Sequence, residues 1–278
     1  MDSKNMTLHE RQGVSYLTFP ALERFAFVRH AFSTRLGGVS PNEYASMNLN
    51  FGRGDDDENV RENFRRFCAA VGFDDKTLVA SSQDHHTFVR RVGKENRGNG
   101  IWKPKDRPSV DGLITNEPNV TLVTYYADCV PLFFVDPVKR AVGLAHAGWR
   151  GTAAKIGQET VNAMRREFGS SPADIFAAIG PSIGPCCFEV DSPVYEAFLA
   201  LDELSPREFI TENGGGKYHI DLWEANRRIL MNAGVPEHQI SCAQLCTKCN
   251  ADWLFSHRAS GGKRGGMAAT ICIAEEMK

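Results

Sequence analysis

Two apolar runs, residues 130–135 and 141–145, are separated by an Asp-Pro turn signal, and this feature constrains the chain more than any other. The pattern predicts an antiparallel β-hairpin. We expect the turn near residues 136–140 and Cys129 opposite His146. Directly opposed residues have Cβ atoms about 4.5–5.5 Å apart. The hairpin therefore brings a thiol and an imidazole together at its open end.

A thiol and an imidazole at that separation can perform two kinds of chemistry. They can share one zinc ion, since Zn–S bonds are about 2.3 Å and Zn–N bonds about 2.0–2.1 Å long, or they can act as a nucleophile and its base. His85, in the sequence Gln83-Asp84-His85-His86, supplies a third candidate ligand, and a catalytic zinc takes three protein ligands. The structural alternatives are a cysteine packed as a small hydrophobic residue and a histidine held by a hydrogen bond.

The composition argues against several classes of protein. The 32 basic and 34 acidic residues give a formal charge of −2, which disfavours a nucleic-acid binder that relies on positive charge. No apolar run is close to about 18 residues, the length that spans a bilayer. The start of the chain is polar and charged, unlike a signal peptide. Eight cysteines without an export signal indicate reduced thiols, so the cytoplasm is the expected compartment.

Strand patterns outnumber helical ones and do not alternate with them strictly. This predicts a single α+β domain over residues 1–278, with mixed sheets and helices packed outside them. The polar, glycine-rich segments 93–106 and 212–217 are expected to be loops, and Asp221 is an expected helix N-cap. The expected strands are 14–19, 25–33, 77–80, 87–92, 120–126, 130–135, 141–145, 175–179, 240–244 and 267–273, and the expected helices are 58–71, 152–168, 192–200 and 222–233.

Two loops carry an arginine beside glycines and hydroxyl groups. In the first, which follows the predicted hairpin, Arg150 lies between glycines and Thr152 can cap the next helix. The second contains Arg35 and the pair Gly37-Gly38. Together these loops could form a seat for a phosphate or another anion. The alternatives are a tight turn with a surface ion pair and a flexible hairpin loop.

The remaining cysteines give a weaker signal. Cys246 and Cys249 have the Cys-x-x-Cys spacing of a zinc knuckle, but no second pair of that kind follows them. Cys242 precedes them in an expected strand. Cys186 and Cys187 are adjacent, which makes it difficult for both to hold one metal. We therefore expect all five to be packed thiols rather than ligands of a structural zinc ion.

Seven short motifs occur in order along the chain: Ser33-Thr34-Arg35 with Gly37-Gly38-Val39-Ser40, Gln83-Asp84-His85, Asp111-Gly112, Ala127-Asp128-Cys129-Val130-Pro131, His146-Ala147-Gly148-Trp149-Arg150-Gly151-Thr152, Gly180-Pro181-Ser182-Ile183-Gly184 and Cys246-Thr247. Together they resemble the YfiH-type purine nucleoside phosphorylases, long labelled multicopper polyphenol oxidases or laccase-domain proteins, with FAMIN as the mammalian relative. The resemblance covers about residues 25–273, nearly the whole chain.

The resemblance implies a layered α/β/β/α sandwich of mixed sheets, similar to the cysteine hydrolases of the cytotoxic-necrotizing-factor type. It implies a zinc ion held by His85, Cys129 and His146, and its motif favours His85 over His86. It also implies phosphorolysis of adenosine, inosine and methylthioadenosine to a free base and ribose 1-phosphate, with adenosine deamination as a second activity. Purine nucleosides and phosphate are the expected partners. Many relatives carry Gly-Arg-Met where this chain has Arg264 followed by two glycines.

Several roles remain open at this stage. Zinc lowers the pKa of bound water to about 7, which suits attack at C6 of adenosine, and such a site needs a proton shuttle. Asp128 is the candidate shuttle, with orientation of a ligand or of the local backbone as its alternative role. Cys129 and His146 are the other catalytic candidates, and Arg35 and Arg150 are the candidates for binding phosphate.

Three other functions compete with this interpretation. The first is a metal-free cysteine hydrolase or deamidase, with Cys129 as nucleophile and His146 as base. The second is a polyphenol oxidase with copper in place of zinc, which the eight histidines disfavour because they form no His-x-His pair. The third is a non-enzymatic interaction module, in which the three candidate ligands would be dispersed.

Overall fold

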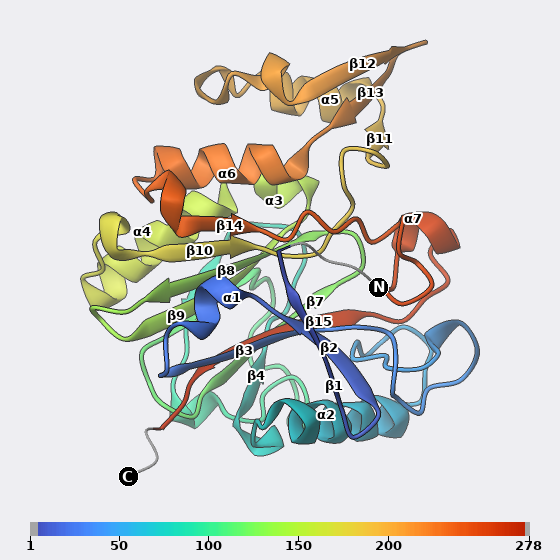
Figure 1. Cartoon of the computed structure of the whole chain (residues 1–278), viewed down its shortest axis with the longest axis vertical. Coiled ribbons are helices and arrows are strands. Elements are labelled where there is room, and N and C mark those ends of the chain that lie inside the picture. Colours follow the sequence, from blue (N-terminus) through green and yellow to red (C-terminus); the bar gives the residue numbers. More distant parts are fainter. Residues whose placement is uncertain (1–4, 276–278) are drawn as a thin grey trace.

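The computed structural model describes residues 5–275, which form two large sheets packed face to face between layers of helices (Figure 1). The first sheet has the order β1-β2-β3-β15-β7-β4 and the second the order β14-β10-β8-β9-β6-β5. The strands of the first are β1 Thr7–Arg11, β2 Val14–Thr18, β3 Val28–Ser33, β15 Met267–Ile273, β7 Thr121–Tyr126 and β4 Leu78–Ala80. Those of the second are β14 Ile240–Cys242, β10 Phe176–Ile179, β8 Val130–Asp136, β9 Ala141–Ala147, β6 Gly112–Thr115 and β5 Val89–Arg91.

Helices cover the outer faces of both sheets. The helices are α1 Pro20–Glu23, α2 Asp57–Val71, α3 Trp149–Ala153, α4 Ile156–Phe168, α5 Ser192–Leu199, α6 Leu222–Asn232 and α7 His257–Ser260. Short 3-10 turns lie at Asn42–Tyr44, Asp75–Thr77, Lys94–Asn96, Pro172–Asp174, Asp202–Leu204, Pro206–Glu208 and Glu237–Gln239. In Figure 1, α2 lies below the first sheet, and α4 and α6 lie above the second. The expected α+β class, mixed sheets and four-layer order are therefore observed.

The middle strands β7, β8, β9 and β15 are mostly apolar and are buried along their whole length, because both of their faces are covered. In β8, alternate side chains point to opposite sides of the sheet. Phe133 and Val135 belong to the core between the two sheets, whereas Leu132 and Phe134 belong to the core beneath α4 and α6. A third core lies between α2 and the first sheet. All of the strands expected from the sequence are present, with ends that differ by up to three residues.

Caps fix the ends of the long helices. The Asp56 side chain accepts the Glu58 N–H at the start of α2, and Gly72 ends that helix in a left-handed conformation. Asp221 accepts the N–H groups of Trp223 and Glu224 at the start of α6, as the sequence predicted. Among the helices within residues 5–275, none is long and apolar enough to cross a membrane.

One expected helix is wrong in its boundaries. The segment expected as one helix from residue 152 is two helices, α3 and α4, because Lys155 adopts a left-handed conformation between them. Helix α3 begins at Trp149 with Gly148 as its N-cap, so Thr152 is not a cap. The Thr152 hydroxyl instead lies inside the helix and donates to the Ala147 carbonyl at 3.2 Å.

The register predicted for the central hairpin is also wrong. Asp136 pairs with Ala141 and Pro131 pairs with His146, so Cys129 lies outside the strand that pairs with β9. The ladder runs up to Asp136 and leaves a four-residue turn, so the residue opposite His146 is Pro131, two positions from the predicted Cys129. A slip of two residues keeps every side chain on its own face of the sheet, whereas a slip of one would reverse it. The thiol and the imidazole therefore still face the same space.

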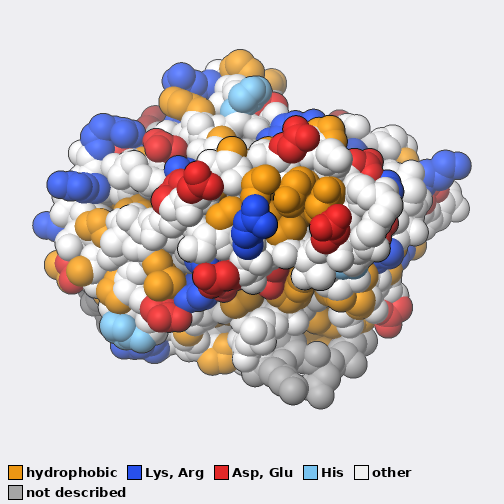
Figure 2. All heavy atoms as spheres, turned by 90° about the horizontal axis from the view of Figure 1, so that it is seen from above, with side chains coloured by type: hydrophobic (Ala, Val, Ile, Leu, Met, Phe, Trp, Pro, Cys, Tyr) orange, Lys and Arg blue, Asp and Glu red, His pale blue; other side chains and the backbone are white. Residues whose placement is uncertain are grey.

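A small third sheet was missed by the sequence reasoning. Strands β11 Glu189–Val190, β12 Ile210–Gly214 and β13 Lys217–Ile220 form it, in the order β11-β13-β12. The segment 212–217, expected to be a loop, instead contains the end of β12, a turn at residues 215–216 and the first residue of β13. This sheet and α5 project beyond α6 in Figure 1. Figure 2 views the molecule from that end and shows apolar side chains gathered among interspersed charges of both signs.

Candidate active site

Two connections that cross from one sheet to the other build the site. Strand β7 of the first sheet is joined to β8 of the second by residues 127–129 alone, and β4 of the first is joined to β5 of the second by residues 81–88. Because β4 and β7 are parallel neighbours, the segments that follow them leave the first sheet at the same end. Cys129 lies on one crossing and His85 on the other. The two segments, 44 residues apart in sequence, therefore meet.

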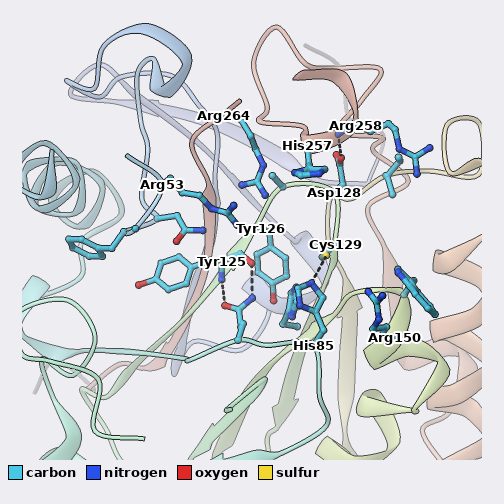
Figure 3. A pocket seen from close by; sticks show the side chains of 18 of the residues that line it. Arg53, His85, Tyr125, Tyr126, Asp128, Cys129, Arg150, His257, Arg258 and Arg264 are labelled. Carbon is cyan, nitrogen blue, oxygen red and sulfur yellow. Dashed lines mark hydrogen bonds between the residues drawn. The ribbon is translucent and has the colours of Figure 1, made fainter. Parts of the chain in front are cut away.

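Gln83 fixes the longer crossing against β7. Its side-chain amide donates to the Tyr125 carbonyl at 2.8 Å, and its side-chain oxygen accepts the Tyr125 N–H at 2.6 Å. These bonds imitate one more rung of a sheet ladder beyond the end of β4. They place the following residues beside Cys129, as the dashed lines in Figure 3 show.

The three predicted ligands converge. The Cys129 sulfur lies 4.0 Å from His85 Nε2, and the His85 and His146 rings meet edge to face with centroids 4.9 Å apart. The sulfur and one nitrogen from each ring all lie within 4.8 Å of one another. Ligand bonds of the usual length give S···N separations of about 3.6 Å around a tetrahedral zinc ion. The Cys129–His85 separation is a few tenths of an ångström longer than that, so these donors can close on one metal ion after a small movement.

Asp111, the residue just before β6, fixes the positions of His85 and His146 through hydrogen bonds. Its carboxylate accepts the backbone N–H groups of Asp84, His85 and His86, each at 3.1 Å. It also accepts a hydrogen bond from His146 Nδ1 at 2.8 Å. With Nδ1 donating, Nε2 carries the lone pair toward the site. Asp111 is completely buried, so no water competes for its oxygens.

Asp111 had no assigned role in the sequence reasoning. An Asp-Gly pair after a polar loop is typical of a turn, and the carboxylate's four donors come from two distant segments. Its place in the Asp111-Gly112 motif was the only available signal. The structure identifies it as the residue that positions two of the three candidate ligands.

The thiol and the His146 ring form a charged pair in the absence of a metal. Burial raises the pKa of the Cys129 thiol, but His146 and His85 outweigh burial and lower that pKa to about 6. Burial lowers the pKa of His146, but the Cys129 thiolate and Asp111 outweigh it and raise that pKa to about 9. Cys129 is therefore poised as a thiolate, the form that binds metals and acts as a nucleophile.

His86 does not reach this centre. Its ring is exposed and pairs with the Asp84 carboxylate at 2.8 Å, and only its backbone faces Asp111. The left-handed conformation of His85 (φ 71°) turns the two neighbouring side chains in different directions. The geometry thus brings His85, and not His86, to Cys129 and His146.

The three residues lie in a cavity of about 530 Å³, a volume typical of small-molecule sites (Figure 3). Aromatic side chains line parts of its wall, namely Phe51, Tyr125, Tyr126, Trp149 and Phe188. Five basic side chains also line it, namely Arg53, Lys105, Arg150, Arg258 and Arg264. Asp128 is the one carboxylate among the described residues of the lining. The cavity thus combines flat apolar surfaces with an excess of positive charge, which suits an aromatic, anionic or phosphate-bearing ligand.

Arg264 is the most unusual of these cations. It is 8% exposed, and burial, together with the neighbouring Arg53, lowers its pKa to about 10. Its Nη1 donates to the Gly265 carbonyl at 2.9 Å, but Nε has no acceptor among residues 5–275. A buried donor without a partner is costly. Figure 3 shows Arg264 and Arg53 side by side above Tyr126, where an anion can accept bonds from both.

The two arginines predicted to bind phosphate lie apart. Arg150 lines the cavity, where its guanidinium stacks on Trp149 at 4.3 Å. Arg35 lines a different, smaller cavity and does not reach the site. Its guanidinium donates to the Ala45 and Ala251 carbonyls and lies over the Phe255 ring. Two donors of Arg35 are thus engaged by backbone carbonyls outside the site, whereas Arg53 and Arg264 line the cavity in its place.

Asp128 lies at the cavity with its carboxylate engaged. Thr247 donates its hydroxyl to Oδ1 and Arg258 donates its backbone N–H to Oδ2, both at 2.6 Å. Figure 3 shows the carboxylate directed toward Arg258 while Cys129 points the other way. Asp128 itself is left-handed (φ 86°), a conformation that these bonds stabilise. The geometry favours the alternative considered from the sequence, in which Asp128 fixes the local backbone.

Comparison with known proteins identifies close relatives. Residues 29–274 match the family model described as multi-copper polyphenol oxidoreductase laccase. The Geobacillus stearothermophilus protein called purine nucleoside phosphorylase YlmD is 41% identical over 254 residues, which are 91% of this chain and 92% of that one. The Bacillus subtilis protein of the same name is 40% identical over 245 residues, or 88% of each chain.

Solved structures give the same result. The crystal structure of the Bacillus licheniformis hypothetical protein YfiH superposes with a TM-score of 0.90 at 34% identity, covering 96% of this chain and 98% of that one. The motif-based resemblance is thereby confirmed, and the mixed-sheet architecture is that of the solved relatives.

Proposed function

The chain belongs to the multi-copper polyphenol oxidoreductase laccase family, and from this premise we propose that it is a zinc-dependent purine nucleoside phosphorylase. Its substrates in this proposal are adenosine, inosine, methylthioadenosine and phosphate, and its products are the free base and the sugar 1-phosphate. Two relatives at 40–41% identity are called purine nucleoside phosphorylases. The observation that carries the proposal is the convergence of His85, Cys129 and His146 inside a cavity lined by cations and aromatic rings.

Zinc is the metal that these residues fit best. Two imidazole nitrogens and one thiolate are ligands that zinc accepts, and three protein ligands leave one position open. Bound there, zinc supplies a Lewis acid that lowers the pKa of a coordinated water to about 7, the chemistry required for attack at C6 in adenosine deamination. We include that deamination as a second activity of the same centre.

Phosphorolysis requires that phosphate be held against the anomeric carbon of the sugar. A phosphate oxygen forms a bond to C1′ while the bond from C1′ to the purine nitrogen breaks, and the departing base takes up a proton. Arg53 and Arg264 can bind the phosphate because their guanidinium groups offer forked donors, and Arg150 adds positive charge across the cavity. Trp149 lines the cavity, is partly exposed and provides an aromatic surface against which a purine can pack.

The chain's own residues also set the protonation of the site. Asp111 fixes His146 with Nδ1 donating and keeps Nε2 available as a ligand. Asp128 remains our candidate for the acid or base of deamination. Its two hydrogen bonds must then rearrange, or it acts only by holding Thr247 and the start of α7 in place.

The purified chain tests this proposal directly. Inosine with phosphate should yield hypoxanthine and ribose 1-phosphate, and Cys129→Ala should abolish the reaction. Cys242→Ala is the matched control, since Cys242 is a half-buried cysteine of β14 outside the cavity lining, and it should retain activity. Unchanged turnover by Cys129→Ala would refute the assignment. Ammonia release from adenosine without phosphate measures the deaminase activity separately.

A metal-free cysteine hydrolase is the second candidate, favoured by one observation. The Cys129 thiolate interacts with the His146 ring, and the His146 ring in turn donates to the Asp111 carboxylate. This is the order of a nucleophile, its base and an acid that orients the base. Metal content and thiol reactivity separate the two functions: a loss of one zinc ion in Cys129→Ala relative to the wild type supports the phosphorylase, whereas no such loss together with rapid alkylation of Cys129 supports the hydrolase. A copper polyphenol oxidase ranks below both, because the eight histidines include no His-x-His pair.

Three wider predictions accompany the proposal. We propose that residues 1–278 form one catalytic domain, to which all three cores contribute. The similarity to cysteine hydrolases of the cytotoxic-necrotizing-factor type remains a prediction, as does a cytoplasmic location, which rests on the eight free cysteines. No role for nucleic acid or membrane is part of the proposal.

A further inference from the structure

Four cysteines outside the cavity described above come together on two loops. Cys186 and Cys187 lie on the loop between β10 and β11, and Cys246 and Cys249 lie on the loop after β14. Their four sulfur atoms all lie within 4.8 Å of one another. The sequence reasoning assigned all of them to packing, and the structure gives them a common centre instead.

The sheet explains why loops about 60 residues apart meet. Strands β10 and β14 are parallel neighbours, with Ile179 paired to Cys242, so the loops that follow them leave the sheet at the same edge. The pairing continues beyond the strands as a bridge between Ser182 and Cys246. Ser182 N–H donates to the Leu245 carbonyl, and Thr247 N–H donates to the Ser182 carbonyl. Each loop is thus held in register where its cysteines begin.

The separations between the sulfurs fit a shared metal ion better than a disulfide. Cys249 Sγ lies 3.6 Å from Cys186 Sγ and 3.5 Å from Cys187 Sγ. Four sulfurs about 2.3 Å from a tetrahedral zinc ion are about 3.8 Å apart. A disulfide requires about 2.05 Å and would join only two of the four sulfurs.

The backbone conformation lets two adjacent cysteines, Cys186 and Cys187, face the same point. Residues 185–187 form a tight turn in which the N–H groups of Cys187 and Phe188 both donate to the Gly184 carbonyl. This turn directs both sulfurs toward Cys249, which lies on the second loop. The Gly184 N–H donates to the buried Cys246 sulfur at 3.3 Å, a bond that stabilises a thiolate.

We propose that Cys186, Cys187, Cys246 and Cys249 bind one structural zinc ion. Thiolate ligands in a tetrahedral set of four select zinc or iron, and a closed set of four protein ligands is typical of a structural rather than a catalytic site. Cys186 and Cys249 are exposed, so the ion can enter from solvent. This second site does not depend on the proposed phosphorylase activity.

A metal at this position would stiffen one wall of the cavity. Ile183 and Phe188 line the cavity from the first cysteine loop. Thr247, between the two cysteines of the second loop, donates to the Asp128 carboxylate. Arg258, which Figure 3 shows beside Asp128, donates to the Cys187 and Glu189 carbonyls at 3.3 and 2.9 Å. The ion would therefore clamp together the loops that carry this side of the site.

Metal counting on the full-length, tag-free chain tests the proposal. Inductively coupled plasma mass spectrometry should find two zinc ions in the wild type, one in Cys249→Ser, one in Cys129→Ser and none in the double variant. Cys242→Ser should keep both, because Cys242 lies outside the four. If the His85 centre binds no metal, the wild type and Cys129→Ser both contain one ion and Cys249→Ser contains none. A Cys249→Ser variant with the wild-type zinc content would overturn the second site.

Thiol protection provides a test that needs no variant. Cys186 and Cys249 are exposed, yet in the zinc-bound chain they should resist iodoacetamide until a chelator removes the metal. Cobalt added to metal-free Cys129→Ser should give the intense thiolate-to-cobalt absorption of a tetrahedral site. Rapid alkylation before chelation, a disulfide between any two of the four cysteines, or iron in place of zinc each contradicts the assignment.

Discussion

Replacing Asp111 by asparagine should weaken metal binding more than any other change that leaves the ligands intact. The carboxylate accepts three backbone N–H groups and the His146 Nδ1–H. An asparagine keeps one oxygen and turns an NH2 group toward the remaining donors. If that NH2 faces His146, the ring must accept at Nδ1 and carry its proton on Nε2, the atom that faces the site.

The expected magnitude follows from these bonds. About two hydrogen bonds to a charged acceptor are lost, each worth about 1.5–3 kcal/mol, so the free energy of unfolding of Asp111→Asn should fall by about 3 kcal/mol or more. Loss of the partner that orients a histidine ligand typically lowers metal affinity about 10–100-fold. Zinc affinity can be measured by competition with a chromophoric chelator, and stability by urea denaturation of the metal-free chain.

Asp136→Asn is the matched control. Asp136 is also completely buried, and its Oδ1 accepts the N–H groups of Val138 and Lys139 in the turn of the central hairpin, away from the cavity. Its loss should lower stability without changing zinc affinity at the His85 centre. If Asp111→Asn binds zinc there as tightly as Asp136→Asn does, Asp111 does not orient His146 in the way inferred.

Further predictions address the phosphate, the pH dependence and the core. Arg264→Gln should raise the KM for phosphate at least about tenfold, because a charged donor without a protein partner among the described residues is removed; an unchanged phosphate KM in steady-state kinetics would show that phosphate binds elsewhere. Burial, and to a lesser extent His9, lowers the pKa of His30 to about 3, so the folded chain excludes a proton that the unfolded chain binds below about pH 6.5. Stability should therefore fall by about 1.4 kcal/mol per pH unit between pH 6 and 4 through this residue, and urea titrations of His30→Gln should show a correspondingly shallower slope; equal slopes would contradict the buried neutral ring. Phe133→Ala should lower the free energy of unfolding by about 3–5 kcal/mol, because Phe133 is completely buried between the two sheets and meets the Phe19 ring edge to face. A loss below about 1 kcal/mol in the same denaturation assay would show that neighbouring side chains fill the space that the ring leaves.

The sequence predicted the elements whose hydrophobic period is clear. Strands β7, β8, β9 and β15 are mostly apolar because each is covered on both faces, and α2 and α6 carry a one-sided apolar stripe between recognisable caps. The small sheet was missed because β12 is largely exposed and rich in polar residues and glycine. Its position depends on packing with β13 and α5, which no local pattern records.

The candidate site was only partly predictable, for reasons that differ between residues. His85, Cys129 and His146 could be named as candidate ligands because zinc accepts cysteine and histidine and because the motifs that contain them resemble those of a known family. The hairpin register was wrong by two, yet the conclusion survived because the period of a strand is two. Arg35 and Arg264 could not be ranked from the sequence, since the difference lies in their surroundings: Arg35 donates to two backbone carbonyls outside the cavity, whereas Arg264 lines the cavity and its Nε has no acceptor among residues 5–275. The four-cysteine centre was missed because it depends on the parallel pairing of β10 with β14.

The buried carboxylates of Asp111 and Asp128 stabilise the strained backbone of the site through hydrogen bonds. His85 and Asp128, which lie on the two crossings on either side of Cys129, are both left-handed residues other than glycine, a conformation that costs about 1–3 kcal/mol at such positions. Asp111 accepts the N–H groups on both sides of His85, and Asp128 accepts the Thr247 hydroxyl and the Arg258 N–H. Each strained residue is thus held by bonds from a distant segment. The site should consequently loosen before the sheets unfold, since its geometry depends on these few bonds rather than on the cores.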